Sequence, residues 1–151
     1  MPPCHAPCPQ VTLDLAAALC FVPAAMQTVH SDSAPAAVGP YSQAIRSGHL
    51  LFCAGQLPLN PETMKIEAAD IAGQTSQVLT NIKAVLAAAD LDLSHVVKTT
   101  VFLKDLGDFA TMNGLYSDAF GSHKPARSTV QVAKLPLDAL VEIEVIAEIA
   151  P

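Results

Sequence analysis

A helical repeat set between strand-like runs does most to limit the folds open to this chain. From Asp70 onward, apolar or small side chains recur every three or four residues, which predicts an amphipathic helix with one buried stripe. A β-branched run, residues 96–104, follows and predicts a strand. Since helices and strands alternate, we expect a sheet with helices packed against it. The stripe consists of Ile71, Thr75, Val78, Leu79, Ile82, Val85, Leu86 and Ala89.

The remaining segments complete an α+β pattern. Residues 41–47 and 50–54 form two short strand-like runs around Ser47-Gly48-His49, which predicts a hairpin. Asp108 can cap a second helix, and Gly121 can end it. The apolar positions of this helix are Phe109, Met112, Tyr116 and Phe120. Two further strands are expected at 128–133 and 140–149. The order β-β-α-β-α-β-β predicts one mixed sheet with both helices on a single face.

That arrangement leaves the other face of the sheet open. In the last strand, alternation directs Val141, Ile143, Val145 and Ala147 toward the helices and Glu142, Glu144, Ile146 and Glu148 away from them. Alternation in the strand at residues 96–104 places Val96 and Phe102 on the open face. Hydrophobic residues make up 51% of the chain and charged residues only 15%, so this face is too apolar to stay in water. We therefore expect a homo-oligomer that covers it.

Charge and hydropathy exclude several classes of partner. The net charge is −6, which argues against a phosphate backbone as the main partner, although His123, Lys124, Arg127 and Lys134 lie close in sequence. No apolar run approaches the roughly 20 residues that span a bilayer. The four cysteines do not form a disulfide framework, which favours a reducing compartment and predicts a cytoplasmic protein.

The chain divides near Met26. Residues 1–25 contain Pro and Cys but no Lys or Arg, and they carry Asp14. We therefore interpret them as a disordered extension, or as the product of an upstream start codon ahead of a natural start at Met26, rather than as a targeting segment. An organellar location stays open as the alternative. Cys4, His5 and Cys8 lack a second pair of ligands, which favours tail thiols over a metal site. Residues 26–151 are the predicted domain.

Two charged residues stand out as candidates for chemistry. Arg127 lies where a loop becomes a strand, and a guanidinium can hold a carboxylate through two hydrogen bonds. Glu142 lies in an otherwise apolar strand and could handle a proton. Taken alone, an arginine such as Arg127 more often forms a surface salt bridge, and a glutamate such as Glu142 more often faces solvent on its strand. Together they indicate chemistry on a small carboxylic acid.

Five segments in order resemble the Rid/YjgF family, the reactive intermediate deaminases, also called the endoribonuclease L-PSP family. They are residues 36–44, 54–58, 97–105, 125–128 and 143–147, within a resemblance that covers about Val29 to Ala150. The resemblance implies a chorismate-mutase-like fold, a homotrimer and clefts between subunits. It also implies hydrolysis of 2-imino acids such as 2-iminopropanoate and 2-iminobutanoate to 2-oxo acids and ammonia, without a cofactor or metal.

The resemblance also implies roles for individual residues. Arg127 matches the arginine that binds the substrate carboxylate, and Glu142 matches the acid that orients or activates water. Tyr41, Gly55 and Asn113 match positions associated with the cleft. Thr129 stands where the family often has cysteine, which argues against a required thiol.

Two other kinds of function stay open at this point. One is a binding or chaperone-like trimer that uses the same clefts for small carboxylates or the open sheet face for clients. The other is a ribonuclease or translation inhibitor, a role also ascribed to members of the family, although the acidic balance counts against it.

Overall fold

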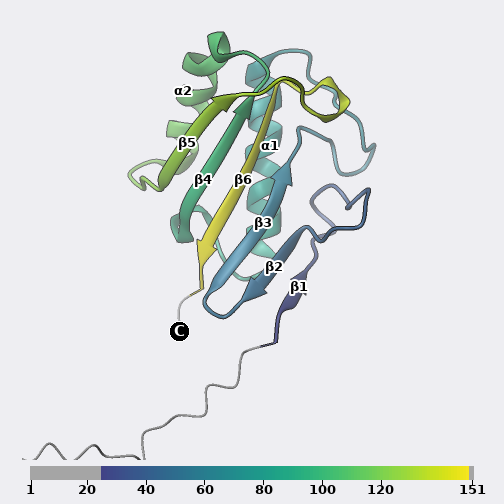
Figure 1. Cartoon of the computed structure of the whole chain (residues 1–151), viewed down its shortest axis with the longest axis vertical. Helices are drawn as coiled ribbons and strands as arrows, with labels where there is room; N and C mark the ends of the chain where they lie inside the picture. The colour runs from purple at the N-terminus through teal and green to yellow at the C-terminus, as the bar shows by residue number, and fades with distance from the viewer. Residues whose placement is uncertain (1–24, 150–151) are drawn as a thin grey trace, which may run out of the picture.

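The computed structural model describes residues 25–149, which fold into one sheet and two long helices (Figure 1). Three short 3-10 turns join these elements. None of the described helices is long and apolar enough to cross a membrane. In chain order the elements are β1 (Gln27–Val29), β2 (Ala44–Ser47), β3 (Leu50–Gln56), α1 (Ile71–Ala87), β4 (Val96–Leu103), α2 (Phe109–Phe120), β5 (Ala126–Gln131) and β6 (Val141–Glu148).

The sheet has the strand order β1-β2-β3-β6-β4-β5. The last strand, β6, therefore lies in the middle, between β3 and β4 (Figure 1). β4 and β5 run parallel, and every other pair of neighbours is antiparallel. The predicted mixed sheet is confirmed. A central β6 matters for function because it places Glu142 between two neighbouring strands.

Both helices pack on one face of the sheet, as predicted. The carboxylate of Asp70 accepts a hydrogen bond from the Gly73 backbone N–H at 2.7 Å, which satisfies one of the free amides at the start of α1. The inward side chains of β6 and the apolar stripe of α1 are almost fully buried in one core with Met112 of α2. The opposite face of the sheet carries no helix (Figure 1).

Strand β1 was not anticipated. It has three residues and pairs with β2, with Thr28 opposite Ile45. A three-residue edge strand has too few positions for a period-2 pattern, so the sequence offers little signal for it. Its continuation is tied to the sheet by the buried Gln43 amide, which accepts from the Ser31 N–H at 2.7 Å and donates to the Pro35 carbonyl at 2.8 Å.

The prediction that Val96 lies on the open face is wrong. Val96 is fully buried in the core, whereas Val97 is 41% exposed. Opposite β6, Val96 pairs with Ala147 and Lys98 with Ile146, so Val97 is an extra residue in β4. Such a bulge shifts the alternation by one residue and puts Val96 on the same face as Thr99. Phe102 and Ile146 keep their predicted place on the open face.

Two local predictions had different outcomes. Gly48 has φ of +60° in the turn between β2 and β3, which confirms the hairpin and explains the glycine. Asp108 immediately precedes α2, but its side chain makes no capping hydrogen bond. Instead Asp105 accepts from the Gly107 N–H at 2.7 Å and caps the 3-10 turn that leads into α2. Gly121 ends α2 with φ of +58°, as predicted.

Candidate functional site

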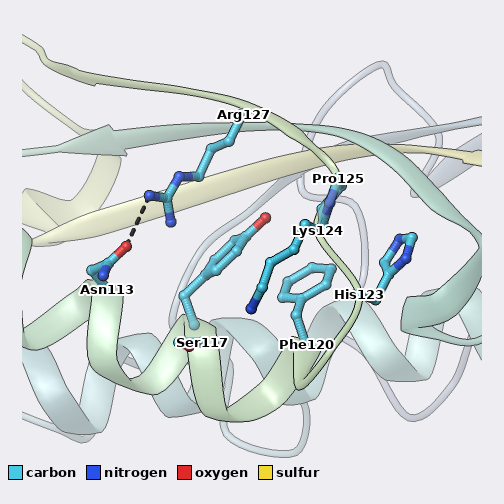
Figure 2. A pocket seen from close by; sticks show the side chains of 8 residues that line it. Asn113, Ser117, Phe120, His123, Lys124, Pro125 and Arg127 are labelled. Carbon is cyan, nitrogen blue, oxygen red and sulfur yellow. Dashed lines mark hydrogen bonds between the residues drawn. The ribbon is translucent and has the colours of Figure 1, made fainter.

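Arg127 is held by side chains of α2. It is the second residue of β5 and lies opposite Thr99 of β4, so its side chain points to the helix-covered face. Its Nη2 donates to Asn113 Oδ1 at 2.8 Å (Figure 2). No carboxylate in residues 25–149 forms an ion pair with it. The arginine is therefore oriented but keeps its capacity for an anion.

Two aromatic rings support this guanidinium, and sequence reasoning assigned them only to the core. The Arg127 Cζ lies 4.6 Å from the ring centroid of Tyr116 and 5.7 Å from that of Phe109. A cation over an aromatic face is attracted by the ring quadrupole. Phe109, Asn113 and Tyr116 are spaced i, i+4 and i+7, which places them along one side of a helix. That spacing is the signal that could have predicted a shared role.

Tyr116 is fixed in turn from the sheet. Its hydroxyl lies 2.9 Å from the Thr99 hydroxyl in a buried hydrogen bond. Burial raises the pKa of the Tyr116 phenol, so the ring stays neutral. The aromatic support under Arg127 is therefore rigid and uncharged.

Arg127 opens onto a pocket of about 390 Å³ beside α2 (Figure 2). None of its lining residues within the described chain is acidic, which is notable in a protein of net charge −6. The wall can therefore donate hydrogen bonds to an anion without a competing carboxylate. It is formed by Asn113, Tyr116, Ser117, Phe120, His123, Lys124, Pro125 and Arg127.

Glu142 lies on the open face of the sheet. It is half-buried in β6 opposite Phe102 and packs over Gly55 of β3. A Cβ built on Gly55 would lie 2.9 Å from Glu142 Cδ and overlap its Oε1. Only glycine leaves room for this carboxylate. Burial raises the pKa of Glu142, and the nearby Glu144 carboxylate adds to the shift.

Tyr41 and Gly55 line a second, more apolar cavity of about 240 Å³. Tyr41 is 52% exposed on the loop before β2, and Leu137 closes another side. Buried amides hold the surrounding loops: Gln43 binds the segment after β1, and Asn81 Nδ2 donates to the carbonyls of Leu57 and Leu59 at 3.0 and 2.9 Å. The loops are thus fixed from the core.

The six predicted site residues fall into two groups. Arg127, Asn113 and Thr129 face the helix side, while Glu142, Gly55 and Tyr41 lie on or beside the open face. The sheet separates the two groups within one chain because Arg127 aligns with the buried Val145 and not with Glu142. The Thr129 hydroxyl is buried with no hydrogen-bond partner in the described chain.

Residues 25–149 contain no group of three or more His, Cys, Asp or Glu side chains placed to hold a metal. Cys4, His5 and Cys8, and the predicted extension up to residue 24, lie outside the described residues. Cys53 is buried in β3, and burial raises the pKa of its thiol to about 12, so it stays protonated.

Comparison with known proteins supports the resemblance. A model of the family described as Endoribonuclease L-PSP matches residues 31–149. A RutC family protein of Pyrococcus horikoshii is 53% identical over 80% of this chain and 96% of its own length. The 2-iminobutanoate/2-iminopropanoate deaminase of Escherichia coli is 48% identical, also over 80% of this chain and 96% of its own. The crystal structure of E. coli TdcF with bound serine superposes with a TM-score of 0.79 at 42% identity, covering 82% of this chain and 99% of that one.

The sheet and the two helices on one face agree with the solved structure of E. coli TdcF, and the sequence matches the family over residues 31–149. The chain belongs to the Endoribonuclease L-PSP family, which includes the RutC and Rid proteins.

Proposed function

We propose that this protein hydrolyses 2-imino acids to 2-oxo acids and ammonia without a cofactor, acting on 2-iminopropanoate and 2-iminobutanoate. The observation that carries the proposal is the Arg127 guanidinium, held by Asn113 and Tyr116 and free of any carboxylate partner in the described chain. A planar guanidinium that is held in place and has no carboxylate partner is suited to bind the carboxylate of a substrate. The activity named for the E. coli relative supports the same reaction.

The chemistry needs little more than positioning. The imine carbon is already electrophilic, so holding it beside a water supplies much of the rate enhancement. The water oxygen bonds to this carbon, and one water proton passes through Glu142 to the nitrogen, which gives a carbon that carries a hydroxyl and an amino group. The hydroxyl proton then passes through Glu142 to the amino nitrogen as the carbon–nitrogen bond breaks, so that ammonia leaves and the carbonyl of the 2-oxo acid forms. Water thus supplies the oxygen and both protons.

The site needs two copies of the chain. Arg127 and Glu142 lie on opposite faces of one sheet, so the carboxylate clamp of one copy must meet the glutamate of another. The open face carries partly exposed Phe52, Phe102 and Ile146, which supports burial against a neighbour. We propose a homotrimer of roughly 47 kDa, three times the 15.7 kDa chain, with a site at each joint. Its proposed compartment is the cytoplasm.

Mixed assemblies test the activity and the shared site together. Arg127→Ala and Glu142→Gln should each be nearly inactive alone. Refolded together in equal amounts, they should recover about a quarter of the wild-type rate of imine decay, because random assembly pairs an intact Arg127 with an intact Glu142 at that frequency. Imine made in situ by an amino-acid oxidase and trapped with semicarbazide provides the measurement.

Each outcome points to one interpretation. Recovery in the mixture supports deamination at a shared site. Active wild type without recovery in the mixture would leave the deaminase but reject the shared site. A wild type that does not accelerate imine decay, yet binds 2-oxobutanoate through Arg127, would favour the small-carboxylate binding protein instead.

A further inference from the structure

The pocket that holds Arg127 also holds a second cation that the proposed reaction does not use. Lys124 lines it, and its Nζ donates to the Gly121 carbonyl at 2.7 Å. Lys124 forms no ion pair with a carboxylate in the part of the chain that the structure describes. The sequence has only eight Lys and Arg residues in all, so two of them in one acid-free pocket is a marked concentration of positive charge.

An aromatic floor leads away from Arg127 toward this end of the pocket. The rings of Tyr116 and Phe120 stack with centroids 4.3 Å apart, and those of Phe120 and His123 lie 6.3 Å apart. Figure 2 shows Asn113 and Arg127 at one end, His123 at the other, and Lys124 and Phe120 between them. The pocket is therefore elongated, with Arg127 at the end near Asn113 and Lys124 farther toward His123.

Two further side chains along the wall, Asn113 and Ser117, can donate hydrogen bonds to a ligand. Asn113 Oδ1 accepts the hydrogen bond from Arg127, so the amide NH₂ of Asn113 can donate to a ligand. His123 Nε2 donates to the Val96 carbonyl at 2.6 Å, which fixes the ring at the far end. The hydroxyl of Ser117 can also donate. A ligand with a negative group at each end matches this set better than one with a single charge.

The pocket is also larger than the smallest substrate requires. At roughly 20 to 30 Å³ for each non-hydrogen atom, 2-iminopropanoate occupies on the order of 150 Å³. The pocket of a single chain, about 390 Å³ before a second copy contributes its wall, is long enough for a side chain beyond the α-carboxylate.

We infer that the site accepts 2-imino dicarboxylic acids, with Arg127 holding the α-carboxylate and Lys124 the side-chain carboxylate. The inference rests on the proposed function, since it names a substrate class for the same pocket. Lys124 is then a specificity-determining residue. Its bond to Gly121 O also caps the C-terminal end of α2, and a purely structural role would alter all substrates alike.

Two imines of matched length test this inference. The imine from glutamate ends in a carboxylate, and the imine from norleucine has a similar reach but ends in a methyl group. Each is made in situ by a suitable amino-acid oxidase, and kcat/KM is measured for the full chain and for Lys124→Met, Lys124→Arg and Lys65→Met. Lys65 lies in an exposed loop outside the pocket, so its variant controls for loss of one charge.

The wild type should prefer the glutamate imine. Lys124→Met should lower the ratio of the two kcat/KM values about tenfold, as expected for loss of one charge-assisted contact. Lys124→Arg should keep most of the ratio, and Lys65→Met all of it. A wild type that prefers the norleucine imine, or a Lys124→Met variant with an unchanged ratio, would overturn the inference.

Calorimetry separates this inference from the proposed function. 2-Oxoglutarate should bind more tightly than 2-oxohexanoate in the wild type, and Lys124→Met should remove the difference. If this holds but neither imine is hydrolysed, the dianion pocket stands and deamination fails. Equal binding of both ligands to the wild type would reject the pocket whatever the activity.

Discussion

The helix side and the open side of the sheet hold their charged residues in different ways. Arg127 is bonded to Asn113 and supported by Tyr116, so its orientation is determined within one chain. Glu142 instead packs over Gly55 and beside Glu144, where burial raises its pKa. The clamp is oriented within the single chain, whereas burial and the nearby Glu144 carboxylate disfavour ionisation of Glu142. The two sides of the sheet would thus contribute different parts of the proposed shared site.

Loss of the clamp should have the largest effect. Arg127→Ala should lower kcat/KM for imine hydrolysis roughly a thousandfold, since a buried charge-assisted contact contributes about 2 to 5 kcal/mol. Arg127→Lys should recover little, because an ammonium loses the paired hydrogen bonds. Steady-state kinetics and light scattering provide the measurements, with the exposed Arg46→Ala as control. An active Arg127→Ala variant would show that the helix side of the sheet does not bind the substrate carboxylate, even though its arginine is held in place.

Loss of the carboxylate should come next. Glu142→Gln should lower kcat roughly a hundredfold, at the low end of what a general base contributes. Unlike Arg127→Ala, it should retain binding of 2-oxobutanoate, which calorimetry can measure.

The same variant should not unfold the protein. Because the folded-state pKa of Glu142 is raised, ionisation of Glu142 opposes folding, and this opposition grows as pH rises through that pKa. Glu142→Gln should therefore be at least as stable as the wild type at pH 7, with the difference lost below the ordinary glutamate pKa. Thermal unfolding of both proteins at pH 7 and at pH 4 provides the check. Lower stability of Glu142→Gln than of the wild type at pH 7 would mean that the Glu142 carboxylate has a stabilising partner in the folded protein.

Crowding Glu142 should have a smaller effect. Gly55→Ala introduces a Cβ where the carboxylate now lies, and displacement of a catalytic group should lower kcat roughly tenfold. In a Glu142→Gln background the same change should add little, because both act on one group. Additive losses in this double-mutant cycle would show that Gly55 acts elsewhere.

Removal of the aromatic support should change binding a few-fold. Tyr116→Leu should raise KM about threefold, the size of a cation–π contact whose cation, Arg127, is partly exposed. Tyr116→Phe keeps the ring and loses only the bond to Thr99, so its KM should stay close to that of the wild type. Equal KM values for the Leu and Phe variants would reject the role of the ring.

The smallest expected effect is a shift in the pH profile. Activity should fall on the acid side as Glu142 takes up its proton, at a pH above that of an ordinary glutamate. Glu144→Gln removes the neighbouring negative charge and should move this limb to lower pH by less than about one unit. If Glu144→Gln leaves the acid limb of the pH profile unchanged, then a group other than Glu142 causes that limb.

Much of this architecture was predictable because it depends on local periodicity. The stripe from Ile71 predicted α1, and alternation in β6 predicted which of its residues face the helices. Arg127 and Glu142 were also found from sequence, the first by its place at a strand start, the second by its place in an apolar strand, and both by the family resemblance. The support from Phe109 and Tyr116 was missed because their apolar spacing is the same as that of ordinary core residues.

Local sequence patterns were enough to predict the order of elements from β2 onward, the faces of the last strand and the two charged candidates. The bulge at Val97 that buries Val96, and the place of Arg127 and Glu142 on opposite sides of the sheet, became evident only from the folded chain. The reason is physical: side-chain alternation is a property of neighbouring residues, whereas register and strand order depend on pairing between segments far apart in the chain.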